Sequence, residues 1–214
     1  MKHHRSWLTV AILLVASGAG TLRSDSATWY VATNGSDAAA GTNWVTAKQT
    51  IQAAVDAASA SDTVLVSNGV YQTGGRKFGS AALTNRVVID KVVTVESVNG
   101  PSVTTIKGAW DPLTTNGNAA VRGVQFTTNG ALIGFTVTNG ATLGTGAAFQ
   151  IDQRGGGILC VSNSVVSNCV IVGNQSSFTG GGVQGGLIYR STIRGNRSAN
   201  GGGARLSTPV GTLF

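Results

Sequence analysis

Residues 167–177 read SNCVIVGNQSS, and the phrase returns in altered form at residues 189–199 as YRSTIRGNRSA. The apolar residues and the Gly-Asn pair of the two copies align at one fixed interval. Such an interval is typical of a solenoid, in which each repeat stacks on its neighbour. The repeat therefore predicts that the chain coils, with a period of about 22 residues in each coil.

The repeat assigns structural roles to two pairs of residues. Ile171 and Ile193 occupy the same position in successive copies, so we expect them to stack in a continuous core. Asn174 and Asn196 each follow a glycine, which is typical of a corner. We expect their side-chain amides to hydrogen-bond along the stack as a ladder.

Short β-branched runs separated by turn residues extend from residue 62 to the end of the chain, with no stretch of helical length between them. Parallel strands usually need helical crossovers, but a chain with three short strands per turn pairs each strand with its counterpart one turn later. Glycine triplets at 155–157, 180–182 and 201–203 mark a second corner. Residues 62–214 are therefore predicted to form an all-β, right-handed parallel β-helix.

Residues 20–61 precede the coils and contain a short strand followed by the one convincing helical pattern. Apolar residues recur at helical intervals over 46–59, and Thr46 and Gln49 have the spacing of a capping box. The first coil of a solenoid exposes an open edge and core, which an apolar-faced helix can cover. The segment is therefore expected to cap the amino-terminal end. The last residues begin another coil, so we expect a fragment of a longer protein, the alternative being an edge covered by a partner.

Residues 1–19 have the pattern of a signal peptide, with a basic start, a short apolar run and small residues at its end. The run is shorter than a membrane span needs, although an uncleaved anchor is the alternative. Removal of this segment takes away both histidines and lowers the net charge from +7 to +5. We expect a protein that is secreted or on the bacterial cell surface, without a transmembrane span. No motif indicates nucleic-acid binding, and the oligomeric state is left open.

Cys160 and Cys169 form an even pair in a chain expected to be exported, where a disulfide is permitted. Cys169, however, occupies the position that Ser191 fills one repeat later. Small side chains stacked in the core explain both cysteines without a disulfide, and we favour this interpretation.

Several stretches resemble a known family. WYVATNGSDAAAGTNWVTAKQTIQAAVDAASASDTVLVSNGVY (29–71) resembles the amino-terminal module of secreted bacterial β-helix proteins of the pectate-lyase-like superfamily. The later GFTVTNG, GGGILC, SNCVIVGN and GGGV resemble the coils of these proteins, including polymorphic outer-membrane-protein-like repeats. The resemblance implies the fold but little of the chemistry, because the superfamily includes lyases, hydrolases, epimerases and surface proteins without activity.

Two enzymatic branches of this superfamily can be compared with the sequence. Polygalacturonases carry an Asp-Asp pair and a Gly-His-Gly motif, and the chain after residue 19 has neither. Lyases of the superfamily use Ca²⁺ and a Lys or Arg base, and calcium requires clustered oxygen ligands. The acidic residues lie far apart in this sequence. They are Asp25, Asp37, Asp56, Asp62, Asp90, Glu96, Asp111 and Asp152.

An insertion of about ten residues precedes the first glycine triplet, and inserted loops are where solenoids place function. In this insertion, Phe149, Gln150, Asp152 and Arg154 could offer a sugar an aromatic face, an amide and two charges. The alternative is a plain surface loop with an internal Asp–Arg contact.

A second cationic loop, GGRKFGS at 74–80, places Arg76 and Lys77 beside an aromatic residue. It could contact an acidic glycan, or be a solvated turn.

The interpretation favoured by the sequence is a non-catalytic, exported β-helix that binds polysaccharide or another surface, without a metal or other cofactor. The alternative is a Ca²⁺-dependent polysaccharide lyase, or another carbohydrate-active enzyme of the superfamily. No residue can be assigned a catalytic role from the sequence.

Overall fold

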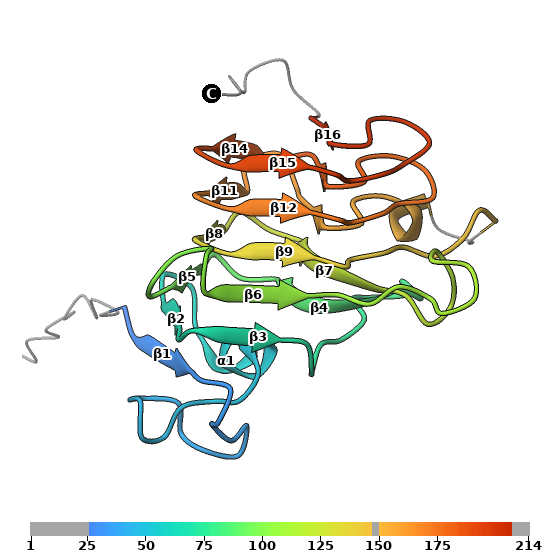
Figure 1. The fold of residues 1–214 in the computed structure, drawn as a ribbon. Coiled ribbons are helices and arrows are strands. Elements are labelled where there is room, and N and C mark those ends of the chain that lie inside the picture. Colours follow the sequence, from blue (N-terminus) through green and yellow to red (C-terminus); the bar gives the residue numbers. More distant parts are fainter. Residues whose placement is uncertain (1–25, 147–149, 207–214) are drawn as a thin grey trace, which may run out of the picture.

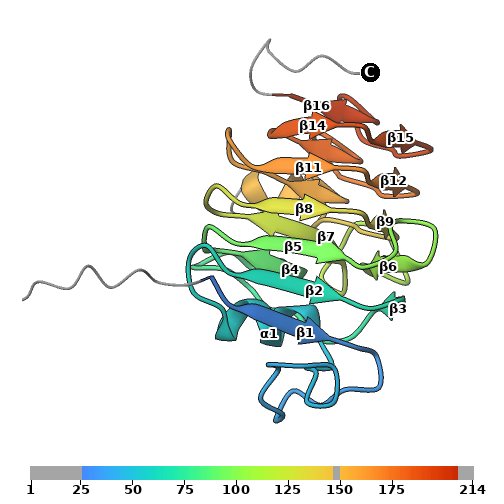
Figure 2. The same ribbon diagram turned by 90° about the vertical axis from the view of Figure 1, so that its left-hand side faces the viewer.

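The protein is a parallel β-helix in the computed structural model, which describes residues 26–146 and 150–206. The chain winds in coils of three short strands, and each strand lies next to its counterpart in the preceding coil (Figures 1 and 2). All pairs between the named strands are parallel. This arrangement confirms the predicted all-β, parallel β-helix. The predicted signal peptide, residues 1–19, lies outside the described residues.

Three sheets run along the stack, and each coil from β2 onward contributes one strand to each sheet. In spatial order, sheet A contains β1 (Thr28–Val31), β2 (Thr63–Val66), β5 (Thr94–Ser97), β8 (Ala131–Ile133), β11 (Val165–Ser167) and β14 (Leu187–Tyr189). Sheet B contains β3 (Gly69–Tyr71), β6 (Thr104–Lys107), β9 (Thr136–Thr138), β12 (Val170–Val172) and β15 (Thr192–Arg194). Sheet C contains β4 (Thr84–Ile89), β7 (Val121–Phe126), β10 (Ile158–Leu159), β13 (Val183–Gln184) and β16 (Ala204–Arg205).

Coil length varies along the stack. The predicted period holds between β12 and β15 and between β11 and β14, whose register partners include Ile171 with Ile193 and Val165 with Leu187. The earlier coils on sheet A are longer. Their successive partners are Thr63–Thr94, Thr94–Ala131 and Ala131–Val165. Because the strands stay short, the additional residues leave the stack at its corners, where loop length is tolerated.

The core is a column of apolar side chains that point inward from all three sheets. Leu132 and Val166 are register partners in successive coils of sheet A, and both are fully buried. Ile171 pairs with Ile193 on sheet B; Ile171 is fully buried, whereas Ile193, in the last described coil, is partly buried. Each fully buried side chain of this size stabilises the fold by roughly 1.5–3 kcal/mol.

A ladder of asparagine side chains closes the corner between sheets B and C. The Asn174 Nδ2 donates to Asn196 Oδ1 at 3.0 Å, and Asn196 Nδ2 donates to the carbonyl of Ile171 at 2.8 Å. One coil earlier the position is Gly140, whose N–H donates to Asn174 Oδ1 at 2.8 Å. The side chain thus satisfies backbone groups that the turn leaves unpaired, as buried polar groups require.

The glycine triplets lie at the start of sheet C, where adjacent coils come very close. Successive triplets pair through their backbones, for example Gly157 N–H with the carbonyl of Gly181 at 3.0 Å. A Cβ at Gly156 would overlap the carbonyl oxygen of Gln175. The repeated glycines are therefore required by this close approach of the backbones.

The α-helix of the described residues, α1 (Ile51–Ala57), lies at the amino-terminal end of the stack (Figure 1). It is shorter than the predicted helix over 46–59. Its N-cap is Thr50, whose Oγ1 accepts a hydrogen bond from the Ala53 N–H at 3.2 Å. The predicted capping box that begins at Thr46 is therefore wrong.

The reason for the later start is the carboxylate of Asp37. It accepts hydrogen bonds from the backbone N–H groups of Gln49 and Thr50 at 2.9 and 2.8 Å, and from the Thr50 hydroxyl at 2.9 Å. These contacts hold the residues before Ile51 in a non-helical conformation. Because Asp37 lies well before this segment in the sequence, a local capping pattern could not reveal it.

Helix α1 covers the open edge of sheet C through Gln52. The Gln52 Oε1 accepts from the Val88 N–H at 2.6 Å, and its Nε2 lies 3.4 Å from the Val88 carbonyl. The side-chain amide thus takes the place of a neighbouring strand. At the other end of the helix, Lys91 Nζ donates to the carbonyls of Val55 and Ala58 at 3.1 and 2.7 Å. This helix therefore gives hydrogen-bond partners to backbone groups at the edge of sheet C that would otherwise be unpaired.

Both cysteines are free thiols. Cys169 is buried at the corner between β11 and β12, and its backbone N–H donates to the Ser191 Oγ at 3.0 Å. The stacking of Cys169 against Ser191 agrees with the interpretation of small side chains in the core rather than a disulfide.

Candidate functional site

A groove follows the corner between sheets B and C. It is lined by residues 110–118, 143–146, 173–177 and 195–199, and we call it the corner groove. Three adjoining hollows of about 400, 580 and 330 Å³ share lining residues and make up this groove. The loop between β6 and β7 forms one of its walls and projects from the side of the stack (Figure 1).

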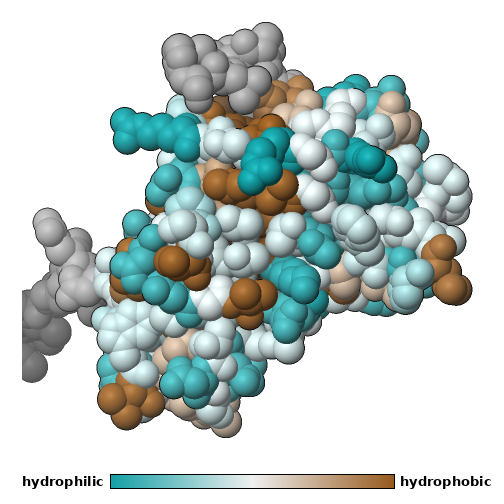
Figure 3. Space-filling view, in the orientation of Figure 1, coloured by the Kyte–Doolittle hydropathy of each residue, from teal (hydrophilic) through white to brown (hydrophobic). Residues whose placement is uncertain are grey.

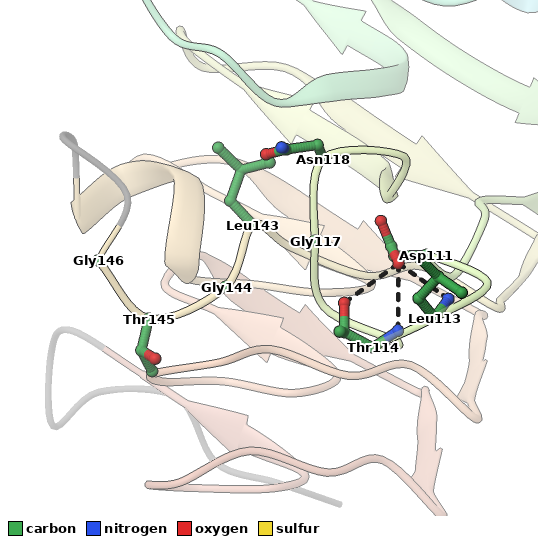
Figure 4. Close-up of a pocket in the computed structure, with 9 residues that line it drawn as sticks. All are labelled: Asp111, Leu113, Thr114, Gly117, Asn118, Leu143, Gly144, Thr145 and Gly146. Atoms are coloured by element: carbon green, nitrogen blue, oxygen red, sulfur yellow. Dashed lines mark hydrogen bonds between the residues drawn. The ribbon is translucent and has the colours of Figure 1, made fainter.

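Asp111 organises the wall-forming loop (Figure 4). Its Oδ1 accepts from the N–H groups of Leu113 and Thr114 at 3.0 and 3.1 Å, and its Oδ2 accepts from the Ala119 N–H at 3.0 Å. These hydrogen bonds lower the pKa of the Asp111 carboxyl below its usual value, and the bond from the Ala119 N–H has the largest effect. The carboxylate therefore serves to shape the loop.

The same loop is anchored to the later coils. Asn116 Nδ2 donates to Thr142 Oγ1 at 3.0 Å and to the carbonyl of Gln175 at 3.3 Å. The Gly117 N–H donates to the Thr142 carbonyl at 3.1 Å. A wall held by these contacts is preformed, so ordering it on ligand binding would cost little free energy.

The groove exposes an aromatic ring, amides, hydroxyls and a guanidinium. Trp110 is 46% exposed and, with Gln175 and Arg197, lines the hollow nearest the asparagine ladder. Ser177 and Thr114 line the neighbouring hollow. On the face shown in Figure 3, apolar residues form separate patches among hydrophilic ones. A groove with one aromatic face and many hydrogen-bonding groups suits a hydrated, hydroxyl-rich ligand.

The charges of the protein are segregated along the stack. Residues 26–152 contain seven acidic and seven basic residues, whereas residues 153–206 contain five arginines and no acidic residue. Four of these, Arg190, Arg194, Arg197 and Arg205, belong to the last described coil and are exposed. All four lie within residues 190–205, in or shortly after β14, β15 and β16, which form one end of the stack (Figure 1). This coil is therefore strongly positive.

The insertion before the first glycine triplet folds differently from what the sequence suggested. Its short 3₁₀-helix η1 (Gln150–Gln153) buries Asp152, whose Oδ2 accepts from the Ala82 N–H at 2.8 Å. Arg154 instead donates to Gln150 Oε1 at 2.7 Å. The side chains of Gln150, Asp152 and Arg154 therefore do not form one exposed cluster. Among the described residues, Asp152 and Arg154 also form no ion pair with each other. Phe149 lies outside the described residues.

Arg122 holds this insertion against β7. Its guanidinium is fully buried and donates to the carbonyls of Ile151, Arg154 and Gly155 at 2.6, 2.9 and 2.9 Å. Burial lowers the pKa of Arg122, while the charge of the neighbouring Asp152 raises it. These contacts give the insertion a structural anchor.

The other predicted loop, 74–80, is tied down by its arginine. Arg76 forms ion pairs with Asp90 at 2.5 Å and with Asp56 at 3.3 Å. Lys77 is exposed beside it. Because the charge of Arg76 is already paired, the loop presents less positive charge than the sequence indicated.

No three side chains of His, Cys, Asp or Glu gather closely enough to hold a metal ion in residues 26–146 and 150–206. No helix in the same residues has the length and hydropathy to cross a membrane.

Similarity to known proteins is confined to the fold. No protein-family model and no curated protein matches the sequence. Among solved structures, a rhamnogalacturonan lyase is similar, with a TM-score of 0.48 and 14% sequence identity. The match covers 84% of this chain and 45% of that chain, so the chain spans less than half of the lyase. A similarity of this degree carries no information about function.

The corner groove was missed by the sequence analysis, although one signal for it was present. A long stretch, 108–120, separates the runs TTIK and VRGVQF, and it includes an aromatic residue and an Asp-Pro turn. Two insertions are therefore visible in the sequence. The more amino-terminal one, with Trp110, forms one wall of the groove, and residues 143–146 of the other line two of its hollows.

Proposed function

We propose that this chain is a non-catalytic carbohydrate-binding β-helix whose corner groove binds acidic polysaccharide. The observation that carries the proposal is the segregation of charge: a coil with arginines and no carboxylate contributes Arg197 to a groove that also exposes Trp110. Clustered positive charge attracts a polyanion and raises its local concentration.

Each group in the groove has a role in this proposal. The apolar face of a sugar ring stacks on Trp110, as ring faces pack on aromatic side chains. Gln175 and the serine and threonine hydroxyls exchange hydrogen bonds with sugar hydroxyls. Arg197 binds the carboxylate of the ligand through its forked N–H groups, which match that geometry.

The acidic residue in the groove has a structural role. The carboxylate of Asp111 accepts hydrogen bonds from three backbone N–H groups and the Thr114 hydroxyl. These bonds stabilise its ionised form, as its lowered pKa reflects, and make it a poor general acid at neutral pH. We also propose export to the cell surface or medium of a bacterium, which rests on the pattern of residues 1–19.

The test is isothermal titration of the full chain with polygalacturonate and with its methyl-esterified form, which keeps the sugar backbone but removes the charge. We expect tighter binding of the charged form, and a loss of roughly tenfold in Arg197→Gln, since a charge-assisted hydrogen bond contributes about 1.5–3 kcal/mol. Trp110→Ala should weaken the binding of both forms. Tyr189→Ala removes a similarly exposed aromatic ring outside the groove and is the control. Equal affinity for both polymers would refute the proposal.

An absorbance assay separates this proposal from the lyase alternative. Lyases leave unsaturated products that absorb near 235 nm, so the same polymers are incubated with the protein in Ca²⁺ and then in EDTA. We expect no increase in absorbance from protein that binds polygalacturonate. An increase that EDTA abolishes would establish the lyase instead.

A further inference from the structure

We infer a second sugar-binding site, for uncharged sugars, at the amino-terminal end of the stack. A hollow of about 380 Å³ is lined by Trp44, Ser67, Asn68, Val98 and Asn99. It lies where the loop before α1 meets the corner between sheets A and B, in the first coils rather than in the last (Figure 1). This site shares no lining residue with the corner groove.

Trp44 supplies the aromatic face of the site. It is 45% exposed, although its ring contacts Tyr30 edge-to-face with centroids 4.8 Å apart. The turn that carries it is fixed by Asn43, whose Oδ1 accepts from the N–H groups of Val45 and Thr46 at 2.9 and 3.0 Å. A large aromatic ring that is half exposed and held in place is preorganised for stacking on a sugar ring.

Two amides from successive coils supply the polar groups. Asn68 follows β2 and Asn99 follows β5, and Asn99 Nδ2 donates to Asn68 Oδ1 at 2.8 Å. Among the hydrogen bonds of the described residues, Asn68 Nδ2 and Asn99 Oδ1 have no partner. One donor and one acceptor, oriented by their mutual bond, therefore face the solvent next to Trp44, and adjacent sugar hydroxyls can satisfy both.

The lining also defines the class of ligand. None of the five lining residues is charged, in contrast to the corner groove with Arg197. Aromatic stacking and neutral hydrogen bonds select a neutral pyranose, and nothing in the hollow would favour a carboxylate. The site goes beyond the proposed function, because it requires no acidic ligand and lies in the part of the chain where charges balance.

The experiment is isothermal titration of the full chain with three neutral oligosaccharides: cellopentaose, xylopentaose and β-1,4-galactopentaose. We expect at least one to bind, and Trp44→Ala to weaken it by roughly tenfold, in line with the contribution of an aromatic contact and its buried area. Asn99→Ala should weaken it as well, since it removes one neutral acceptor and the hydrogen bond that orients Asn68. Tyr189 is 50% exposed, and the Tyr189→Ala variant should bind like the unchanged chain.

Two results would overturn the inference: no heat of binding with all three oligosaccharides, or binding that Trp44→Ala and Asn99→Ala leave unchanged. Titration of Trp44→Ala with polygalacturonate keeps this test apart from the proposed function. Retained polygalacturonate binding, with the neutral sugar lost, supports two separate sites. Loss of both ligands in a variant that melts like the unchanged chain would contradict their separation.

Discussion

Cys169 shows how the burial of a single residue makes the stability of this fold depend on pH. Burial raises the pKa of its thiol to about 11, against about 8.5 in an unfolded chain. Below about pH 8.5 both states keep the proton, and above it the unfolded chain loses the proton first. The free energy of unfolding should therefore fall as the pH rises from about 8.5 to about 11.

Cys169→Ser provides the control, because serine does not titrate in this range and already fills the equivalent position at Ser191. We expect the free energy of unfolding, measured with urea between pH 8 and 10.5, to decline less steeply with pH for the variant, whatever its value at pH 8. Identical declines in the two proteins would show that this thiol does not contribute.

Asp152 illustrates the limit of sequence reasoning at this scale. The residue types in the insertion suggested an exposed pair of charges, but the aspartate turns inward to the N–H of Ala82, 70 residues away, and lies near Arg122. Nothing local in the sequence encodes that distant partner. By contrast, Asn174 and Asn196 could be located from the repeat, because partners one coil apart carry the same residue type.

At the scale of elements, the first coil depends on α1, and on Gln52 in particular. Replacing Gln52 with alanine removes the amide that pairs with the Val88 backbone, which is buried. We expect a loss of about 1–3 kcal/mol in the free energy of unfolding, the cost of leaving a buried backbone group unpaired. Urea denaturation measures it, and faster hydrogen exchange at Val88 should accompany it.

Gln49→Ala is the matched control, since Gln49 is exposed and precedes the helix. Its effect should stay within about 0.5 kcal/mol, as for most surface substitutions. Equal effects of the two substitutions would contradict the assignment of Gln52 as a substitute strand.

The type of each element could be predicted from the sequence better than its limits. Alternating apolar residues and glycine corners were sufficient to predict the parallel strands, because each coil repeats the same pattern of residue types. The limits of α1 depend on Asp37, and the lengths of the early coils depend on corner loops that the core does not constrain. For this reason the predicted period described the last coils and not the first.

At the scale of the whole molecule, the arginines of the last coil should make polyanion binding sensitive to salt. Arg194→Gln and Lys77→Gln each remove one exposed positive charge, the first in the arginine-rich last coil and the second in the charge-balanced part. We expect Arg194→Gln to reduce both the affinity for polygalacturonate and its salt dependence, because fewer counterions are displaced. Titrations over a series of NaCl concentrations measure this.

Lys77→Gln should change these quantities much less. A larger effect of Lys77→Gln than of Arg194→Gln would move the binding surface to the 74–80 loop, the second of the two loops that the sequence suggested.

The most direct test of the corner groove as the binding site is hydrogen–deuterium exchange of the full chain, with and without polygalacturonate. We predict slower exchange in residues 110–118, 143–146, 173–177 and 195–199, and little change in 33–48 or 74–80. Slower exchange confined to the strands of sheet A or to residues 74–80, with none in the groove, would contradict this assignment.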